Sequence, residues 1–175
     1  VCFIVSNVIK NCSKELSILN LKLKIPKTKY LSYDEAIKLC KLKNGDDFSP
    51  EDEKKLCSMF PDTIIFTHSW PISLKPFYIL PKDKRLSKGF DALYGGIEIS
   101  SGGQRVHIPS ILIKQLKDKG LNPKNFEFYV NSFRNGSPIH SGWSIGLERF
   151  TMALLKLDNI REACLYPRDR DRLTP

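Results

Sequence analysis

The fold of this chain is decided by residues 89–107, which read GFDALYGGIEISSGGQRVH. Two short segments with apolar residues flank Gly95 and Gly96. A Gly-Gly pair between such segments is typical of a β-hairpin with a two-residue turn. The stretch therefore predicts two antiparallel strands joined at these glycines.

The turn also predicts which residues of the hairpin lie opposite each other. Counting outward from it places Leu93 opposite Glu98 and Asp91 opposite Ser100. Directly paired residues share a face of a sheet, and side chains alternate along each strand. We therefore expect these four side chains on one face, with the two carboxylates as diagonal neighbours.

Two close carboxylates repel each other unless a positive charge lies between them. Mg²⁺ suits such a pair, because it is commonly held by one or two carboxylates together with phosphate oxygens and water. Asp91 and Glu98 are thus candidate metal ligands. The alternative is a solvated sheet face that carries two ordinary acids.

An arginine follows the hairpin after a pair of glycines. Gly102 and Gly103 allow close backbone approach, and Arg105 comes two residues later. The planar guanidinium of arginine suits a bidentate carboxylate, so Arg105 is a candidate substrate-binding residue. Equally, it could only neutralise Asp91 or Glu98.

A third segment, residues 140–150, has small residues at alternate positions and runs directly into a predicted helix. Gly142 and Gly146 allow a flat ligand to lie against the backbone, and Arg149 can hold an anionic phosphate. Glycines at this spacing also occur where they only cap or pack a helix.

Outward from these segments, residues 1–61 are expected to form a mainly helical region. Ser32 with Glu35, and Ser49 with Asp52, have the spacing that caps helix starts, and Asn44-Gly45 is expected to end the first of these helices.

Residues 62–175 are expected to form an antiparallel sheet flanked by helices, which gives an α+β fold. The expected strands and helices of this part are strands at 63–67, 77–80 and 163–167, and helices at 109–118, 122–133 and 146–156.

The composition indicates a globular protein of 175 residues with a net charge of +9, and such a charge favours polyanionic partners such as ATP or RNA. The five cysteines form no Cys-x-x-Cys pair, so we expect free thiols in a reducing cytoplasm rather than disulfides or a zinc site. No apolar run is long enough for a membrane helix.

Several segments together resemble the class II aminoacyl-tRNA synthetases, in the aspartyl and asparaginyl branch of archaeal and eukaryotic type. Gly142 to Phe150 is similar to their motif 3. The similarity to their substrate-site hairpin lies in Phe90-Asp91, Gly96 to Ile99 and Gly103 to His107. Other parts of the family are similar to Lys75 to Tyr78, Tyr33 to Ile37 and the C-terminal segment 159–175.

The resemblance implies roles for particular residues. Asp91, Glu98 and Ser101 would contribute to an Mg²⁺–ATP site, and Arg149 would hold the γ-phosphate. Arg105 would bind the side-chain carboxylate or amide of the amino acid. The two glycines, Gly142 and Gly146, would let adenine and substrate lie close to the strand. The implied reaction forms an aminoacyl-adenylate and transfers the amino acid to tRNA, with catalytic parts for Glu98, Arg105 and Arg149.

The chain also departs from the family. No Arg-x-Glu strand of motif 2 precedes the hairpin, and motif 1, expected to form a homodimer, and the anticodon-binding barrel have no counterpart. We therefore expect the chain alone to form no adenylate. Ser73 stands where aspartyl enzymes usually carry Lys and asparaginyl enzymes Glu, which leaves the amino acid open. Ser141 and Ser144 replace common glycines.

Three functions remain open on this basis. The first is part of an aspartyl-tRNA synthetase. The second is an asparaginyl-tRNA synthetase or a related asparagine synthetase that works without tRNA. The third is a non-catalytic paralogue with a binding role.

Overall fold

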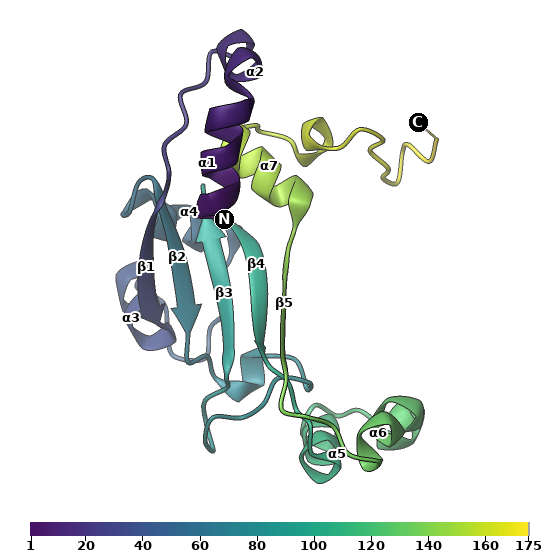
Figure 1. Ribbon diagram of the computed structural model, residues 1–175. Coiled ribbons are helices and arrows are strands. Elements are labelled where there is room, and N and C mark those ends of the chain that lie inside the picture. Colours follow the sequence, from purple (N-terminus) through teal and green to yellow (C-terminus); the bar gives the residue numbers. More distant parts are fainter. Residues whose placement is uncertain (175) are drawn as a thin grey trace.

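One five-stranded sheet organises the computed structural model of the chain, which describes residues 1–174 (Figure 1). The strands follow one another across the sheet in sequence order: β1 (Lys27–Ser32), β2 (Thr63–His68), β3 (Gly89–Tyr94), β4 (Ile97–Gln104) and β5 (Ser141–Ile145). Each neighbouring pair is antiparallel except β1 and β2, which run parallel. The antiparallel sheet expected for residues 62–175 is therefore confirmed in β2 to β5, and β1, from residues 1–61, adds a parallel edge that makes the whole sheet mixed.

The parallel pair arises because the chain crosses from β1 to β2 through helices α3 and α4. Residues 1–61, expected to be mainly helical, thus also supply one strand of the sheet. Only Leu31 of β1 is buried, and three of its six residues are lysines or threonine at exposed or half-exposed positions. Such an edge strand has little of the alternating apolar pattern by which strands are recognised.

The helices lie on both faces of the sheet and at its ends (Figure 1). Both capping boxes are confirmed: Ser32 and Glu35 bond reciprocally at the start of α3, and Ser49 and Asp52 at the start of α4. Helix α3 ends earlier than Asn44-Gly45, because Lys41 takes the left-handed conformation. The bounds are α1 (Cys2–Asn11), α2 (Ser13–Ile18), α3 (Tyr33–Cys40), α4 (Pro50–Ser58), α5 (Pro109–Asp118), α6 (Glu127–Arg134) and α7 (Leu147–Leu155).

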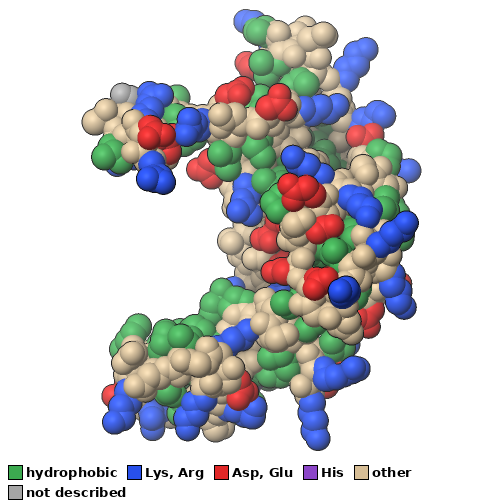
Figure 2. Space-filling model, turned by 180° about the vertical axis from the view of Figure 1, so that it is seen from behind, with side chains coloured by type: hydrophobic (Ala, Val, Ile, Leu, Met, Phe, Trp, Pro, Cys, Tyr) green, Lys and Arg blue, Asp and Glu red, His purple; other side chains and the backbone are tan. Residues whose placement is uncertain are grey.

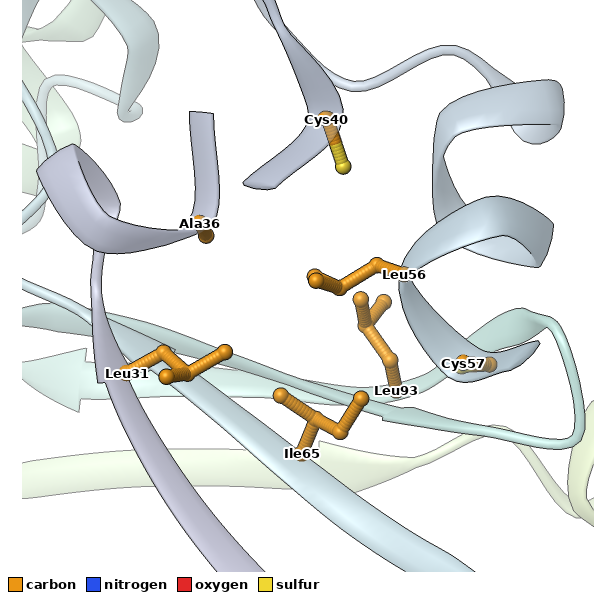
Figure 3. Packing of buried hydrophobic residues seen from close by; sticks show 7 residues of the cluster. All are labelled: Leu31, Ala36, Cys40, Leu56, Cys57, Ile65 and Leu93. Atoms are coloured by element: carbon orange, nitrogen blue, oxygen red, sulfur yellow. The ribbon is translucent and has the colours of Figure 1, made fainter. Parts of the chain in front are cut away.

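Two apolar layers hold the helices against the sheet. On one face, α3 and α4 cover the cluster in Figure 3, which consists of Leu31, Ala36, Cys40, Leu56, Cys57, Ile65 and Leu93. On the other face, α1 and α7 cover Val5, Ile64, Ala92, Ile99, Phe150 and Leu154. Leu93 and Ala92 are neighbours on β3 that point to opposite layers, as strand alternation requires.

The hairpin of β3 and β4 forms as expected, but its register contains a β-bulge. Gly95 and Gly96 have φ values of 62° and 91°, which a two-residue turn of this kind requires. Leu93 pairs with Glu98, yet the register then shifts, so that Asp91 pairs with Ser101 instead of Ser100. The expected pairing of Asp91 with Ser100 is wrong, because one extra residue of β4 is inserted between the two pairs.

Two expected strands are absent from the described residues 1–174. Residues 77–80 make only single bridges, such as that between Ile79 and Arg105. The strand expected at 163–167 does not form, and the chain there begins with a short 3₁₀ helix, η3 (Ile160–Ala163). Two further 3₁₀ helices are η1 (Ile72–Leu74) and η2 (Pro123–Phe126). Helices α5 and α6 pack together as a separate lobe below the sheet (Figure 1).

Candidate functional site

The bulge decides which side chains share the face of the sheet that α4 covers. Glu98 pairs with Leu93 on this face, and Ser101 pairs with Asp91 on the same face. Ser100 instead pairs with Ala92 and faces the opposite layer. Asp91, Glu98 and Ser101 are therefore brought together, and the expected place of Ser100 beside them is wrong.

Asp91 is buried and forms an ion pair with Lys75, whose side chain is also largely buried. The Lys75 ammonium lies 4.0 Å from the centre of the Trp70 ring. Burial raises the pKa of the Asp91 carboxyl, and the Lys75 charge opposes that rise. No role was assigned to Lys75 from the sequence, where its only signal is a cation within an otherwise apolar stretch.

Glu98 is half-buried, and within residues 1–174 its carboxylate makes neither a hydrogen bond nor an ion pair. Burial and then the nearby Asp91 charge raise the pKa of Glu98, while Lys75 and Arg149 act in the opposite direction. A carboxylate whose pKa is raised by burial and by a neighbouring acid creates a local demand for positive charge.

Arg149 lies early in α7 and is exposed, so its guanidinium is accessible to a ligand. Its Nη1 atom donates a hydrogen bond to the main-chain oxygen of Glu98 at 3.2 Å. Gly146, the residue before α7, donates its N–H to the carbonyl of Ile99 at 2.9 Å. These two contacts attach the start of α7 to the bulged part of β4.

Arg105 lies just beyond β4 and points over the backbone of β5. A Cβ atom added at Gly142 would come within 2.9 Å of the Arg105 guanidinium, so a larger residue there would displace this side chain from its present position. The guanidinium is 4.9 Å from the centre of the Tyr78 ring. At Gly146 the nearest atom would be 3.6 Å away, an ordinary contact that would displace nothing.

The two remaining candidates are serines, one beside the acids and one on a separate element. Ser101 is exposed and pairs across to Ser144 of β5, on the same face as Asp91. Ser73 is exposed on η1, and its carbonyl accepts a hydrogen bond from the Lys119 ammonium at 2.6 Å. Within residues 1–174, no hydrogen bond joins Ser73 to Arg105.

The donor set of Asp91, Glu98 and Ser101 fits a hard cation that carries its own additional ligands. No group of three or more His, Cys, Asp or Glu side chains within residues 1–174 could hold a metal ion by itself. Mg²⁺ needs no such group when phosphate oxygens and water complete its shell. Seen from the side opposite to Figure 1, acidic side chains gather at the hollow between the C-terminal segment and the α5–α6 lobe (Figure 2).

Comparison with known proteins gives one consistent family. The model of "tRNA synthetases class II (D, K and N)" matches residues 1–170. The chain is 41% identical over 178 residues to the aspartate–tRNA(Asp/Asn) ligase of Methanocaldococcus jannaschii, covering 97% of the chain and 40% of the relative. It is 43% identical to the aspartate–tRNA(Asp) ligase of Thermococcus kodakarensis, over 93% of the chain and 40% of the relative.

Solved structures agree in fold. The aspartyl-tRNA synthetase of Entamoeba histolytica superposes with a TM-score of 0.92 at 35% identity, over 99% of the chain and 39% of that protein. The asparaginyl-tRNA synthetase of Pyrococcus horikoshii gives a TM-score of 0.90 at 31% identity, over 99% of the chain and 44% of that protein.

The chain thus spans about two fifths of the length of the curated relatives it matches. No helix among residues 1–174 has the length and apolar character needed to cross a membrane. The match covers nearly the whole chain and includes both the hairpin and the strand that enters α7. The chain belongs to the class II tRNA synthetase family that comprises the aspartate, lysine and asparagine enzymes.

Proposed function

We propose that this chain supplies the nucleotide and amino-acid binding part of an aspartate–tRNA ligase, which activates aspartate with ATP and transfers it to tRNA. The observation that carries the proposal is the convergence of Asp91, Glu98 and Arg149 around the bulge of β4. Two acids for a metal, on β3 and β4, and an exposed arginine for a phosphate, on α7, are thereby held close to one another. The names of the relatives supply the amino acid.

The reaction depends on the positioning of the reactants and on compensation of the phosphate charge more than on proton transfer. The amino-acid carboxylate attacks the α-phosphorus of ATP, the bond to the bridging oxygen breaks, and pyrophosphate leaves with the electron pair. Arg149, exposed beside Glu98, would bind the γ-phosphate and orient the leaving pyrophosphate. Gly142, on β5, and Gly146, just before α7, would leave space for the nucleotide.

Asp91, Glu98 and Ser101 would hold Mg²⁺, which when bound supplies positive charge to the phosphate oxygens. Burial raises the pKa values of both carboxylates that would accept it, Asp91 and Glu98. An empty acid pair of this kind is electrostatically unfavourable, and a divalent cation relieves it. Lys75 offsets part of the charge of Asp91 and leaves Glu98 without a direct partner.

Arg105 would bind the side chain of the amino acid, because its planar fork matches a carboxylate. A carboxylate gains a charge-assisted bidentate contact that an amide lacks, which favours aspartate. Ser73 adds no charge to this choice, so asparagine is the second candidate. Activation of aspartate and of asparagine by the complete gene product, measured as pyrophosphate exchange, separates the two.

The central test is the binding of Mg²⁺–ATP to the chain, measured by isothermal titration calorimetry. We expect Arg149→Ala to weaken binding by roughly tenfold or more, because a charge-assisted contact to phosphate contributes about 1.5–3 kcal/mol. Arg134→Ala is the matched control, since Arg134 is an exposed arginine in the last turn of α6. Equal affinity of wild type and Arg149→Ala would refute the role of Arg149.

The remaining parts of the proposal concern the complete protein. We infer that it uses tRNA as the acceptor, acts as a homodimer and works in the cytoplasm. The basic balance of the chain, +9, suits a polyanionic partner. Sedimentation of the complete gene product with and without tRNA tests both the dimer and the acceptor.

A further inference from the structure

The main chain of Glu98 has no strand partner on the outer side of β4. β5 pairs with β4 only from Ser100 to Gln104, so it does not reach Glu98. In a two-residue hairpin, the N–H and C=O of the residue after the closing pair point away from the partner strand. Both groups of Glu98 therefore need partners from elsewhere, because unpaired buried backbone groups are costly.

Side chains of two helices from opposite faces provide these partners. The Glu98 N–H donates to Oε2 of Glu53, on α4, at 3.0 Å. The Glu98 carbonyl accepts from Arg149, on α7, at 3.2 Å. Neither α4 nor α7 is a sequence neighbour of β4, so the local conformation of Glu98 depends on tertiary contacts.

Glu53 is half-buried, and within residues 1–174 its carboxylate forms no ion pair. Burial raises the pKa of its carboxyl, while the hydrogen bond from Glu98 and the nearby Arg149 charge lower it. A glutamate placed in such surroundings is unfavourable unless its contacts compensate. The contact to Glu98 is thus the feature that explains its position.

We propose that Glu53 is a positioning residue of the metal–nucleotide site: by holding the amide of Glu98 at the bulge, it keeps the Glu98 carboxylate directed toward Asp91. This inference rests on the proposed function. Glu53 acts through Glu98 and touches neither metal nor nucleotide. Its oxygen, rather than its charge, is the essential element.

Substitutions at Glu53 separate the hydrogen bond from the charge. Glu53→Gln keeps an oxygen that can accept the hydrogen bond from the Glu98 N–H but removes the charge. Glu53→Asp keeps the charge but shortens the side chain by one methylene group, which moves the oxygen away from the Glu98 N–H. Glu53→Ala removes both. Glu51→Ala and Glu51→Gln are matched controls, because Glu51 is exposed in the first turn of the same helix.

Mg²⁺–ATP affinity by calorimetry is the first measurement. We expect Glu53→Ala and Glu53→Asp to weaken affinity by about tenfold, Glu53→Gln to stay within about threefold of wild type, and both Glu51 variants to be unchanged. The second measurement is amide hydrogen exchange at Glu98, which should accelerate in Glu53→Ala and Glu53→Asp and stay slow in Glu53→Gln. A purely structural role would not produce this ordering.

The outcomes distinguish this inference from the proposed function. If Glu98→Ala loses Mg²⁺–ATP binding while Glu53→Ala retains it, the inference is overturned and the proposed function stands. Equal loss in Glu53→Gln and Glu53→Ala would also overturn it, because charge would then be decisive. A wild-type chain that binds no Mg²⁺–ATP would overturn the proposed function and this inference with it.

Discussion

Glu98 and Asp91 are carboxylates that the fold holds in unfavourable surroundings. Burial raises the pKa of both, and the charge of Asp91 raises that of Glu98 further. A carboxyl whose pKa is higher folded than unfolded contributes stability below its unfolded pKa, and that contribution is lost as pH rises through the folded pKa. The ionised forms of these two carboxyls therefore reduce the stability of the fold.

We expect the chain without Mg²⁺ to lose stability as pH rises from about 4 towards neutral, through the Asp91 and Glu98 titrations. Glu98→Gln should flatten this dependence and raise the melting temperature near pH 7 by about 2 °C or more, because it removes the like-charge repulsion. Urea unfolding at several pH values gives the pH dependence and thermal unfolding gives the melting temperature, with Glu148→Gln, at an exposed glutamate of α7, as the control. An unchanged pH slope in Glu98→Gln would contradict the prediction.

Lys75 is the residue whose loss should be most costly at this site. Its ammonium is the partner of the buried Asp91 carboxylate. Removing one partner of a buried pair leaves an uncompensated charge, so Lys75→Met should destabilise the chain by about 3–5 kcal/mol at neutral pH.

The double variant Lys75→Met with Asp91→Asn removes both charges and should recover most of that loss. Denaturant unfolding of the two single variants and the double variant gives the coupling energy. Additive losses would show that the pair is not energetically coupled.

At this scale, residue types predicted much of the site and geometry supplied the rest. The glycine turn placed Asp91 and Glu98 on one face, and the structure agrees. Ser100 was misplaced because a period of two cannot reveal an inserted residue. Lys75 and Glu53 reach the site through tertiary packing, which no local pattern records.

Among the elements, the β3–β4 hairpin depends on close packing at its turn. A Cβ atom at Gly95 would lie 2.9 Å from Cβ of Ala153 on α7, and φ there is 62°. Gly45 also has a positive φ, of 99°, but nothing lies within 4 Å of its added Cβ. Both glycines therefore have a positive φ that disfavours other residues, but only Gly95 is also closely packed.

We expect Gly95→Ala to destabilise the chain by about 2–4 kcal/mol, the sum of backbone strain and overpacking. Gly45→Ala should cost only the backbone part, about 1 kcal/mol. Thermal unfolding of both variants tests the difference. Equal losses would mean that α7 yields to the added methyl group without cost.

Element prediction succeeded where local signals were strong. Capping boxes marked the starts of α3 and α4, and the glycine pair marked the hairpin. β1 was missed because KTKYLS has a single buried side chain, Leu31. Residues 77–80 carry a strand-like composition, but flanking prolines and the turn at η1 limit them to isolated bridges.

At the scale of the whole molecule, β5 forms an edge of the sheet. It pairs with β4 on one side only, within the described chain, and its Trp143 is 64% exposed. An exposed apolar edge strand is a template for pairing with another chain.

We expect the 175-residue chain to self-associate with rising concentration, and Trp143→Lys to reduce that association. Leu147→Lys is the control, since Leu147 is 69% exposed but belongs to α7. Sedimentation velocity over a concentration series gives the measurement. A wild-type chain that remains monomeric throughout would show that the edge is protected.

The bulge in β4 has a consequence for how such sites are found in other sequences. An uninterrupted strand repeats its surface chemistry at even intervals, whereas the acid and the hydroxyl of this one are three positions apart, at Glu98 and Ser101. When two residues on the same face of a strand are an odd number of positions apart, the spacing indicates a residue inserted between them. Deleting Ile99 would remove the bulge and leave Ser101 two positions after Glu98, still on the same face, but it would also remove an apolar side chain buried between the sheet and helices α1 and α7.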